Sequence, residues 1–328
     1  MKTLSISVAA YNMENLIRQN LDSFVLSPAA PEIEVLVIND GSTDGTAQIV
    51  REYEKKYPDT IRLIDQPNAG PGSTVNRGME QATGKYFRMV DADDWVGEGF
   101  ADYVQVLQET DADLVLTDYV CVDDKTGQER FCPVEGIEAG KVFPFRSASV
   151  SLCPPMHSVT WKTELLQRNG IRLFNGFYTD IQYLLFPVPY VETVLYVNRT
   201  VYMYRVSLSG QSVSVASMQR NLPMHDSVLF SLTELYSRIR EENPAAADYI
   251  LRRTVLVAGA QMSTLLSFPP SGERKRDLYA FLDRLQRECP EVYRVFSKLK
   301  TVRVLRLGGG LFYRLVSHLH RRRLGLEG

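Results

Sequence analysis

The chain has 328 residues, of which 45% are hydrophobic and 23% are charged, and this composition excludes a globally disordered protein. The formal net charge is only −2, but residues 292–326 contain nine lysines and arginines and no aspartate or glutamate, so a basic tail follows an acidic remainder. No run of about 20 apolar residues occurs, so we expect no transmembrane helix.

The four cysteines, Cys121, Cys132, Cys153 and Cys289, form no CxxC pair and match no zinc-binding spacing. We therefore expect reduced thiols, as in cytoplasmic proteins. The residues after Met1 form a short strand-like run with two serines rather than a secretory signal, which also predicts a cytoplasmic protein.

The first third of the chain alternates strand-like runs with segments of helical periodicity. Strands are expected at residues 4–10, 34–39, 61–66, 86–91 and 114–117, and helices between them at 14–26, 43–57, 73–82 and 100–110. This alternation predicts an α/β fold with a mostly parallel central sheet. Ligands of such sheets bind at the carboxyl ends of the strands, where the motifs below lie.

The rest of the chain divides into two parts. Residues 118–215 are less regular, with strands expected at 192–196 and 201–205. Residues 216–328 have helical periodicity, with a break at 269–272 and a basic amphipathic tail. We therefore expect one domain over 1–215 and a helical C-terminal region over 216–328.

An acidic cluster, Asp91-Ala92-Asp93-Asp94, follows the expected strand at 86–91. Three carboxylates within four positions repel one another unless a cation balances them. Carboxylates and diphosphate oxygens are hard ligands that suit Mg²⁺ or Mn²⁺. A solvated acidic turn is the simpler alternative, but the position at a strand end favours a metal site with Asp93 and Asp91 as ligands.

Three further motifs follow strand ends. Tyr11 can stack on a flat base, or pack under the first helix. Asp40 can accept a hydrogen bond from the imide of a uracil ring, whereas Asp44 suits a helix cap. Residues 68–78 place glycines before a helix whose N-terminus favours phosphate, without the spacing of a Rossmann fingerprint.

Together these motifs resemble glycosyltransferase family 2, whose members are inverting enzymes with a GT-A fold. The family's PxYNxE is similar to residues 9–14, with Ala9 in the proline position, and its DDGSTD, NxGxxxARNxG and DxDD are similar to residues 39–44, 68–78 and 91–94. The resemblance is dense over residues 4–97 and looser to about 214. It implies a nucleotide-sugar half at about 1–117 and an acceptor half at about 118–215.

The resemblance also implies roles for individual residues. Asp180 occupies the place of the catalytic base, although Thr179 replaces the family's glutamate before it, and a helix N-cap is the alternative. Arg205, in a segment similar to YYYRxxxxS, would meet phosphate oxygens or form a structural ion pair. The residues expected to bind the nucleotide sugar are Ala9, Tyr11, Glu14, Asp40, Gly70, Asn76, Asp91, Ala92 and Arg205.

These features predict a metal-dependent, inverting, non-processive glycosyltransferase of the hexosyltransferase type. It would move a sugar from a nucleotide sugar, expected to be UDP-linked, to a saccharide or lipid-linked saccharide in cell-surface polysaccharide or glycan synthesis. Two alternatives stay open: a catalytically inactive family member that acts as a binding or assembly partner, and a sugar nucleotidyltransferase. The latter would need a glycine-rich basic loop after the first strand, which residues 9–14 do not provide.

The tail suggests a partner of its own. Leu311, Phe312, Leu315, Val316 and Leu319 are expected on one helical face, with Arg314, His318 and Arg321 opposite. Such a helix suits peripheral contact with an anionic membrane through residues 294–323, on the inner face of the cell membrane. The alternative is that this helix packs on the protein's own core. The sequence leaves open whether the protein forms a homo-oligomer. No motif supports nucleic-acid binding.

Overall fold

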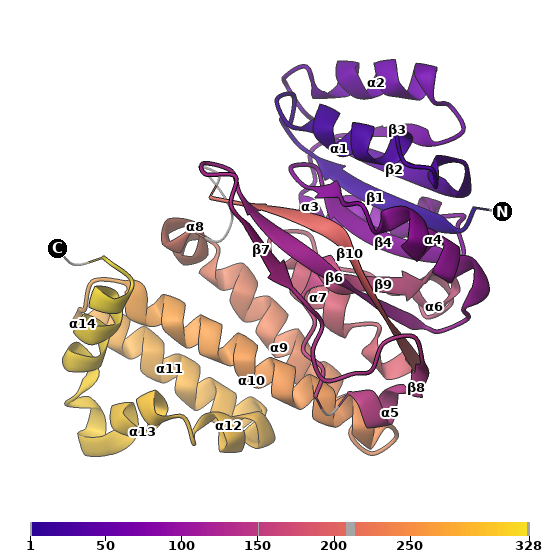
Figure 1. Ribbon diagram of the computed structural model, residues 1–328. Coiled ribbons are helices and arrows are strands. Elements are labelled where there is room, and N and C mark those ends of the chain that lie inside the picture. Colours follow the sequence, from indigo (N-terminus) through magenta and orange to yellow (C-terminus); the bar gives the residue numbers. More distant parts are fainter. Residues whose placement is uncertain (1, 150, 208–213, 327–328) are drawn as a thin grey trace. The chain divides into compact units, whose positions relative to one another are not determined.

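The computed structural model describes residues 2–149, 151–207 and 214–326 and divides into two compact units, Met1–Ser209 and Gly210–Gly328 (Figure 1). The first unit is built on one sheet, and the described part of the second unit is helical. Across the described ranges, no helix combines the length and the apolar character needed to cross a membrane.

The sheet of the first unit has the strand order β3-β2-β1-β4-β9-β6-β10-β5, with β7 paired to β6 and β8 paired to β10. The strands β1 to β4 run parallel to one another, and β6 is parallel to β10. The bounds are β1 (Leu4–Ala10), β2 (Ile33–Asp40), β3 (Ile61–Gln66), β4 (Tyr86–Asp91), β5 (Trp95–Val96), β6 (Leu114–Asp123), β7 (Glu129–Cys132), β8 (Val142–Pro144), β9 (Val159–Lys162) and β10 (Thr193–Val206).

Two strands differ from the sequence-based expectation. The short strand β9 enters the sheet between β4 and β6 and pairs antiparallel with both, so β6 does not lie next to β4. The two strands expected at 192–196 and 201–205 are one strand, β10, whose register against β6 shifts between Val197 and Tyr202. Such an irregularity bends a strand locally. It lies between the two apolar runs, which is why the sequence suggested two strands instead of one.

Helices cover both faces of this sheet. The helices of the first unit are α1 (Ile17–Val25), α2 (Thr46–Lys56), α3 (Pro71–Gln81), α4 (Phe100–Glu109), α5 (Phe145–Ala148), α6 (Thr163–Arg168) and α7 (Thr179–Leu185). Along β1, the side chains of Leu4, Ile6 and Val8 alternate with Ser5 and Ser7, as a strand requires. The apolar side chains pack with those of α1, α2 and α4, and Ser7 faces Gly78 of α3 on the other side.

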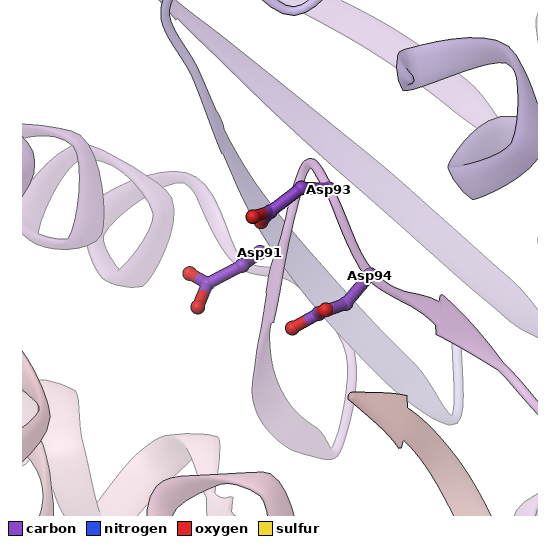
Figure 2. Close-up of side chains that lie close together, drawn as sticks. All are labelled: Asp91, Asp93 and Asp94. Atoms are coloured by element: carbon purple, nitrogen blue, oxygen red, sulfur yellow. The ribbon is translucent and has the colours of Figure 1, made fainter. Parts of the chain in front are cut away.

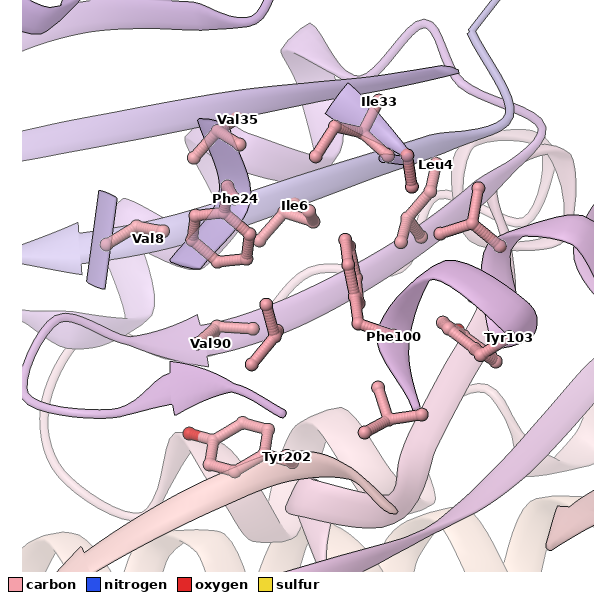
Figure 3. Packing of buried hydrophobic residues seen from close by; sticks show 14 of the residues in the cluster. Leu4, Ile6, Val8, Phe24, Ile33, Val35, Val90, Phe100, Tyr103 and Tyr202 are labelled. Carbon is pink, nitrogen blue, oxygen red and sulfur yellow. The ribbon is translucent and has the colours of Figure 1, made fainter. Parts of the chain in front are cut away.

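The main core of the first unit lies on the α1 and α4 side of the sheet. Figure 3 shows Phe24 of α1 and Phe100 and Tyr103 of α4 beside Ile6, Val8 and Val90 of the strands. The rings of Phe24 and Phe100 meet edge to face with centroids 6.0 Å apart. Because each fully buried side chain of this size contributes about 1.5–3 kcal/mol, this cluster fixes β1 and β4, whose ends carry Ala10 and Asp91.

The second unit packs around its longest helix, α10 (Pro244–Ser267). The others are α8 (Val215–Arg220), α9 (Leu222–Ile239), α11 (Gly272–Glu288), α12 (Pro290–Phe296), α13 (Lys300–Arg306) and α14 (Tyr313–Arg323). The expected break at 269–272 separates α10 from α11, and the Ser271 side chain caps α11 by accepting from Arg274 N.

The packing of α3 requires a glycine at its start. A Cβ atom on Gly72 would lie 1.9 Å from the carbonyl oxygen of Phe174, which precedes α7. Asn76, one turn later, donates from Nδ2 to the Leu173 carbonyl and accepts from Leu173 N, both at 2.8 Å. The first two turns of α3 therefore hold the segment that leads into α7.

Gly72→Ala is expected to lower the free energy of unfolding by about 1–3 kcal/mol, because the methyl group forces α3 away from the Phe174 carbonyl. Urea denaturation followed by circular dichroism measures the change. The control is Gln48→Ala at an exposed position of α2, with an expected effect of about 0.5 kcal/mol or less. Equal effects of the two substitutions would contradict close packing at Gly72.

Candidate functional site

The acidic cluster lies in the tight turn between β4 and β5. Asp91 ends β4, Asp94 N donates to the Asp91 carbonyl at 3.0 Å, and Ala92 is buried. One carboxylate oxygen from each of Asp91, Asp93 and Asp94 lies within 4.8 Å of the others, and Figure 2 shows the three side chains gathered around the turn. The turn therefore concentrates three acidic groups in a space that a single cation could occupy.

Asp94 differs from the other two aspartates because it is only 1% exposed and is held by β10. Its carboxylate accepts hydrogen bonds from the Tyr202 hydroxyl at 2.6 Å and from Arg205 N at 2.7 Å. Desolvation, together with the charges of Asp91 and Asp93, raises the pKa of Asp94 to about 9. Because each of its two carboxylate oxygens accepts one of these hydrogen bonds, Asp94 anchors the turn to β10.

The side chain of Asn20 clamps the backbone of the same turn. Its Nδ2 donates to the carbonyl of Asp94 at 2.8 Å and to that of Asp91 at 3.1 Å. Sequence reasoning gave no role to Asn20 or Tyr202. The sequence could have indicated Asn20, because it is a polar residue on the apolar face of α1, beside Ile17, Leu21 and Phe24. A buried amide needs hydrogen-bond partners, so such a residue is expected to bind the backbone nearby.

Asp91 and Asp93 remain partly accessible. Desolvation, followed by the negative charges of Asp93 and Asp180, raises the pKa of Asp91 to about 7. Desolvation also raises the pKa of Asp93. Desolvation disfavours the negative charge of both carboxylates, and a divalent cation with oxygen ligands would offset that cost. The residues that would hold such a cation are Asp91 and Asp93.

Asp180 lies in the first turn of α7 and is exposed. The residue before α7, Tyr178, has left-handed backbone dihedrals, with φ 67°. Because the charge of Asp180 contributes to the raised pKa of Asp91, the fold brings this carboxylate near the acidic turn although 88 positions separate them in sequence. The Gln182 side chain accepts from Phe174 N at 2.6 Å and holds the loop before α7.

The tip of β1 lies beside the acidic turn, because Ala9 pairs with Asp91 in the parallel register. Tyr11 follows the strand and is 48% exposed. Asn12 joins this tip to the loop after β2 by accepting from Thr43 N at 2.9 Å, and its N–H donates to the Ser42 hydroxyl at 3.0 Å. The exposed ring of Tyr11 is thus presented on a braced loop.

Several other expected nucleotide-binding residues are used within the fold. Asp40 is buried and accepts from Gln66 Nε2, Ala69 N and Gly70 N at 2.8–2.9 Å, so it fixes the loop before α3. The Glu14 carboxylate accepts from Gly45 N at 2.7 Å. Gly70 has a positive φ of 87°, which favours glycine at this turn. These contacts hold the loops at the strand ends in place. They also occupy carboxylate oxygens of Asp40 and Glu14 that a ligand could otherwise bind.

Arg205 also has partners within the protein. Its Nε donates to the Asp93 carbonyl at 2.8 Å, its Nη1 pairs with Asp124 at 2.5 Å, and its guanidinium lies over the Trp95 ring. This arrangement favours the structural ion pair over the phosphate contact as its role. Arg205 binds the acidic turn twice, through its backbone N–H and its side chain.

The comparisons with known proteins agree with this geometry. Residues 5–157 match the family model described as glycosyl transferase family 2. Residues 5–157 form a glycosyltransferase family 2 domain. Glycosyltransferase GlyA of Streptococcus pneumoniae is 31% identical over 221 residues, which cover 62% of this chain and 30% of GlyA. A poly(ribitol-phosphate) beta-glucosyltransferase of Bacillus spizizenii is 34% identical over 116 residues, which cover 34% of this chain and 18% of that enzyme.

Solved structures share the fold. The crystal structure of Staphylococcus aureus TarS 1–349 in complex with UDP-GlcNAc superposes with a TM-score of 0.70 at 22% identity, over 98% of this chain and 92% of that chain. A mannosyltransferase from Pyrobaculum calidifontis in complex with GDP-Man and Mn²⁺ gives a TM-score of 0.50 at 17% identity, over 97% and 86%. The expected GT-A fold with a helical C-terminal region is confirmed.

The raised pKa of Asp91 predicts pH-dependent metal binding. Below about pH 7 a cation must displace the proton on Asp91, so Mn²⁺ affinity is expected to rise about fivefold from pH 6 to pH 7, and about twofold more above pH 7 before it levels off. Electron paramagnetic resonance of free Mn²⁺ measures this affinity. Asp91→Asn, which removes the titrating group, should flatten the profile. A flat profile in the unmodified protein would show that Asp91 is not a ligand.

Proposed function

We propose that this protein is a metal-dependent, inverting glycosyltransferase that moves a sugar from a UDP-sugar to a saccharide or lipid-linked saccharide in cell-surface polysaccharide synthesis. The observation that carries the proposal is the pair Asp91 and Asp93 at the end of β4, together with Asp180 of α7, whose charge contributes to the raised pKa of Asp91. Transfer from a nucleotide sugar requires carboxylates that hold the metal on the diphosphate and a further carboxylate that activates the acceptor hydroxyl.

Asp91 and Asp93 hold the donor end of the site. A bound Mn²⁺ or Mg²⁺ ion would supply Lewis-acid stabilisation for the departing diphosphate. Asp94, Tyr202 and Asn20 keep both carboxylates in place through the bonds to the turn. The exposed ring of Tyr11 is available to stack on the base of the nucleotide.

Asp180 acts as the general base in this scheme. Its carboxylate takes the proton from an acceptor hydroxyl, the hydroxyl oxygen forms a bond to the anomeric carbon, and the bond from that carbon to the diphosphate breaks with its electron pair on the diphosphate. Attack opposite the leaving group inverts the anomeric centre. The exposure of Asp180 leaves room for an acceptor beside it.

Similar proteins support the substrate classes. TarS has been crystallised with UDP and with UDP-GlcNAc, and it has the higher TM-score of the two neighbours described above. The relatives include a poly(ribitol-phosphate) beta-glucosyltransferase and a minor teichoic acid biosynthesis protein of Bacillus subtilis. These names support a cell-wall polymer as the acceptor class. The chain spans less than a third of GlyA and less than a fifth of the B. spizizenii enzyme.

The proposal is tested by a donor screen and one substitution. UDP-glucose, UDP-GlcNAc, UDP-galactose and GDP-mannose are incubated with Mn²⁺, Mg²⁺ or EDTA, and released nucleotide is measured with polyol-phosphate and saccharide acceptors. Asp180→Asn is expected to lower transfer about 10²–10⁴-fold, because it removes the base, while UDP–Mn²⁺ affinity by calorimetry stays unchanged.

The matched control is Asp59→Asn at an exposed site of the same unit, which should keep full transfer. Near-normal transfer by Asp180→Asn would place the base elsewhere. A catalytically inactive binding partner would bind a UDP-sugar and release no nucleotide with any acceptor. Release of pyrophosphate from a nucleoside triphosphate and a sugar phosphate would instead indicate a nucleotidyltransferase.

A further inference from the structure

The end of the second unit carries an exposed row of apolar side chains. Leu307, Leu311, Leu315 and Leu319 recur every four residues from η4 (Leu307–Gly310) into α14, with exposed fractions of 61%, 81%, 54% and 55%. Residues four apart lie on one face of a helix, so Leu311, Leu315 and Leu319 form a continuous stripe. Phe312, also exposed, extends it.

The opposite face of α14 packs against its own unit. Tyr313 and Ser317 are buried, the Ser317 hydroxyl donates to the Leu266 carbonyl at 3.1 Å, and Arg321 Nη1 donates to the Ser267 carbonyl at 2.6 Å. Arg321 thus lies on the face opposite the leucines, as the sequence predicts, and it binds the carbonyl of the last residue of α10. Packing through α14 uses polar contacts and leaves the leucines outside.

Basic side chains border the leucine stripe. Arg314 and His318 flank it along α14, and Arg322 and Arg323 follow at the end of the helix, all of them exposed. Residues 292–326 contain no carboxylate side chain that could neutralise them locally. The surface thus combines an apolar stripe with a positive border.

We propose that this stripe, defined by Leu311, Phe312, Leu315 and Leu319, docks on the surface of an anionic lipid bilayer. An amphipathic helix lying in the plane of the interface buries its apolar face among the acyl chains, while arginines at its border meet the lipid phosphates. At a rise of 1.5 Å per residue, the 11 residues of α14 cover about 16 Å of the interface. This docking is independent of the sugar-transfer proposal.

The charges favour a bilayer over a second copy of the chain. A symmetric contact between two copies would bring Arg314, Arg322 and Arg323 of both copies together, without a carboxylate from residues 292–326 between them. A nucleic acid would satisfy the arginines but would leave the leucines in water. A bilayer with anionic headgroups satisfies both parts of the surface.

The test is flotation of the purified full chain with phosphatidylcholine vesicles that contain 0% or 30% phosphatidylglycerol. We expect binding only to the anionic vesicles, and weaker binding in 0.5 M NaCl than in 0.1 M NaCl. The double variant L315S/L319S should lower the binding constant about tenfold, because two leucines leave the interface. The matched control is Leu256→Ser, which changes a leucine of α10 that is 59% exposed and should bind as the unmodified chain does.

UDP–Mn²⁺ affinity is measured in the same samples and should be equal in all of them, which separates this test from that of the transfer reaction. Failure of the unmodified chain to float with anionic vesicles, or equal flotation of L315S/L319S, would overturn the proposal. A concentration-dependent dimer in size-exclusion chromatography that L315S/L319S abolishes, without vesicle binding, would assign the stripe to a second copy.

Discussion

The Asp94 carboxylate, buried between the Tyr202 hydroxyl and the Arg205 amide, is the contact on which the acidic turn depends. A buried carboxyl group without partners would cost several kcal/mol, so the turn and β10 require each other. The Tyr202 hydroxyl oxygen also accepts a hydrogen bond from Asp91 N at 3.1 Å, so one hydroxyl ties two of the three aspartates to β10. Adjacent aspartates thus differ in role: Asp94 faces the protein, and Asp91 and Asp93 stay accessible.

A second set of contacts holds the other half of the site. Gly72 and Asn76 of α3 bind the segment at Leu173 and Phe174, and Gln182 closes it from the α7 side. Asp40 fixes the loop that leads into α3. The glycine-rich motif therefore joins the sheet edge to the segment before Asp180, and a change in α3 would shift a carboxylate about 100 positions away in the sequence.

Much of the first half of the fold follows from local sequence patterns. The apolar strands, their helices and the placement of Tyr11, Asp40 and Asp91 at strand ends were predictable because periodicity and a parallel sheet fix them. The insertion of β9 between β4 and β6 could not be predicted, because antiparallel pairing between distant segments leaves no periodic pattern in the sequence. The internal partners of Asp40 and Arg205 could not be predicted either, because a sequence motif does not reveal whether a charged side chain contacts a ligand or other residues of the fold.

Anomalous diffraction from a crystal grown with Mn²⁺ and UDP would show which aspartates of the acidic turn bind the metal. We expect a manganese peak at bonding distance from Asp93 or Asp91, with Asp94 still accepting hydrogen bonds from Tyr202 and Arg205. A manganese ion bound to Asp94 with the Tyr202 hydrogen bond broken, or no peak at the turn, would contradict this expectation.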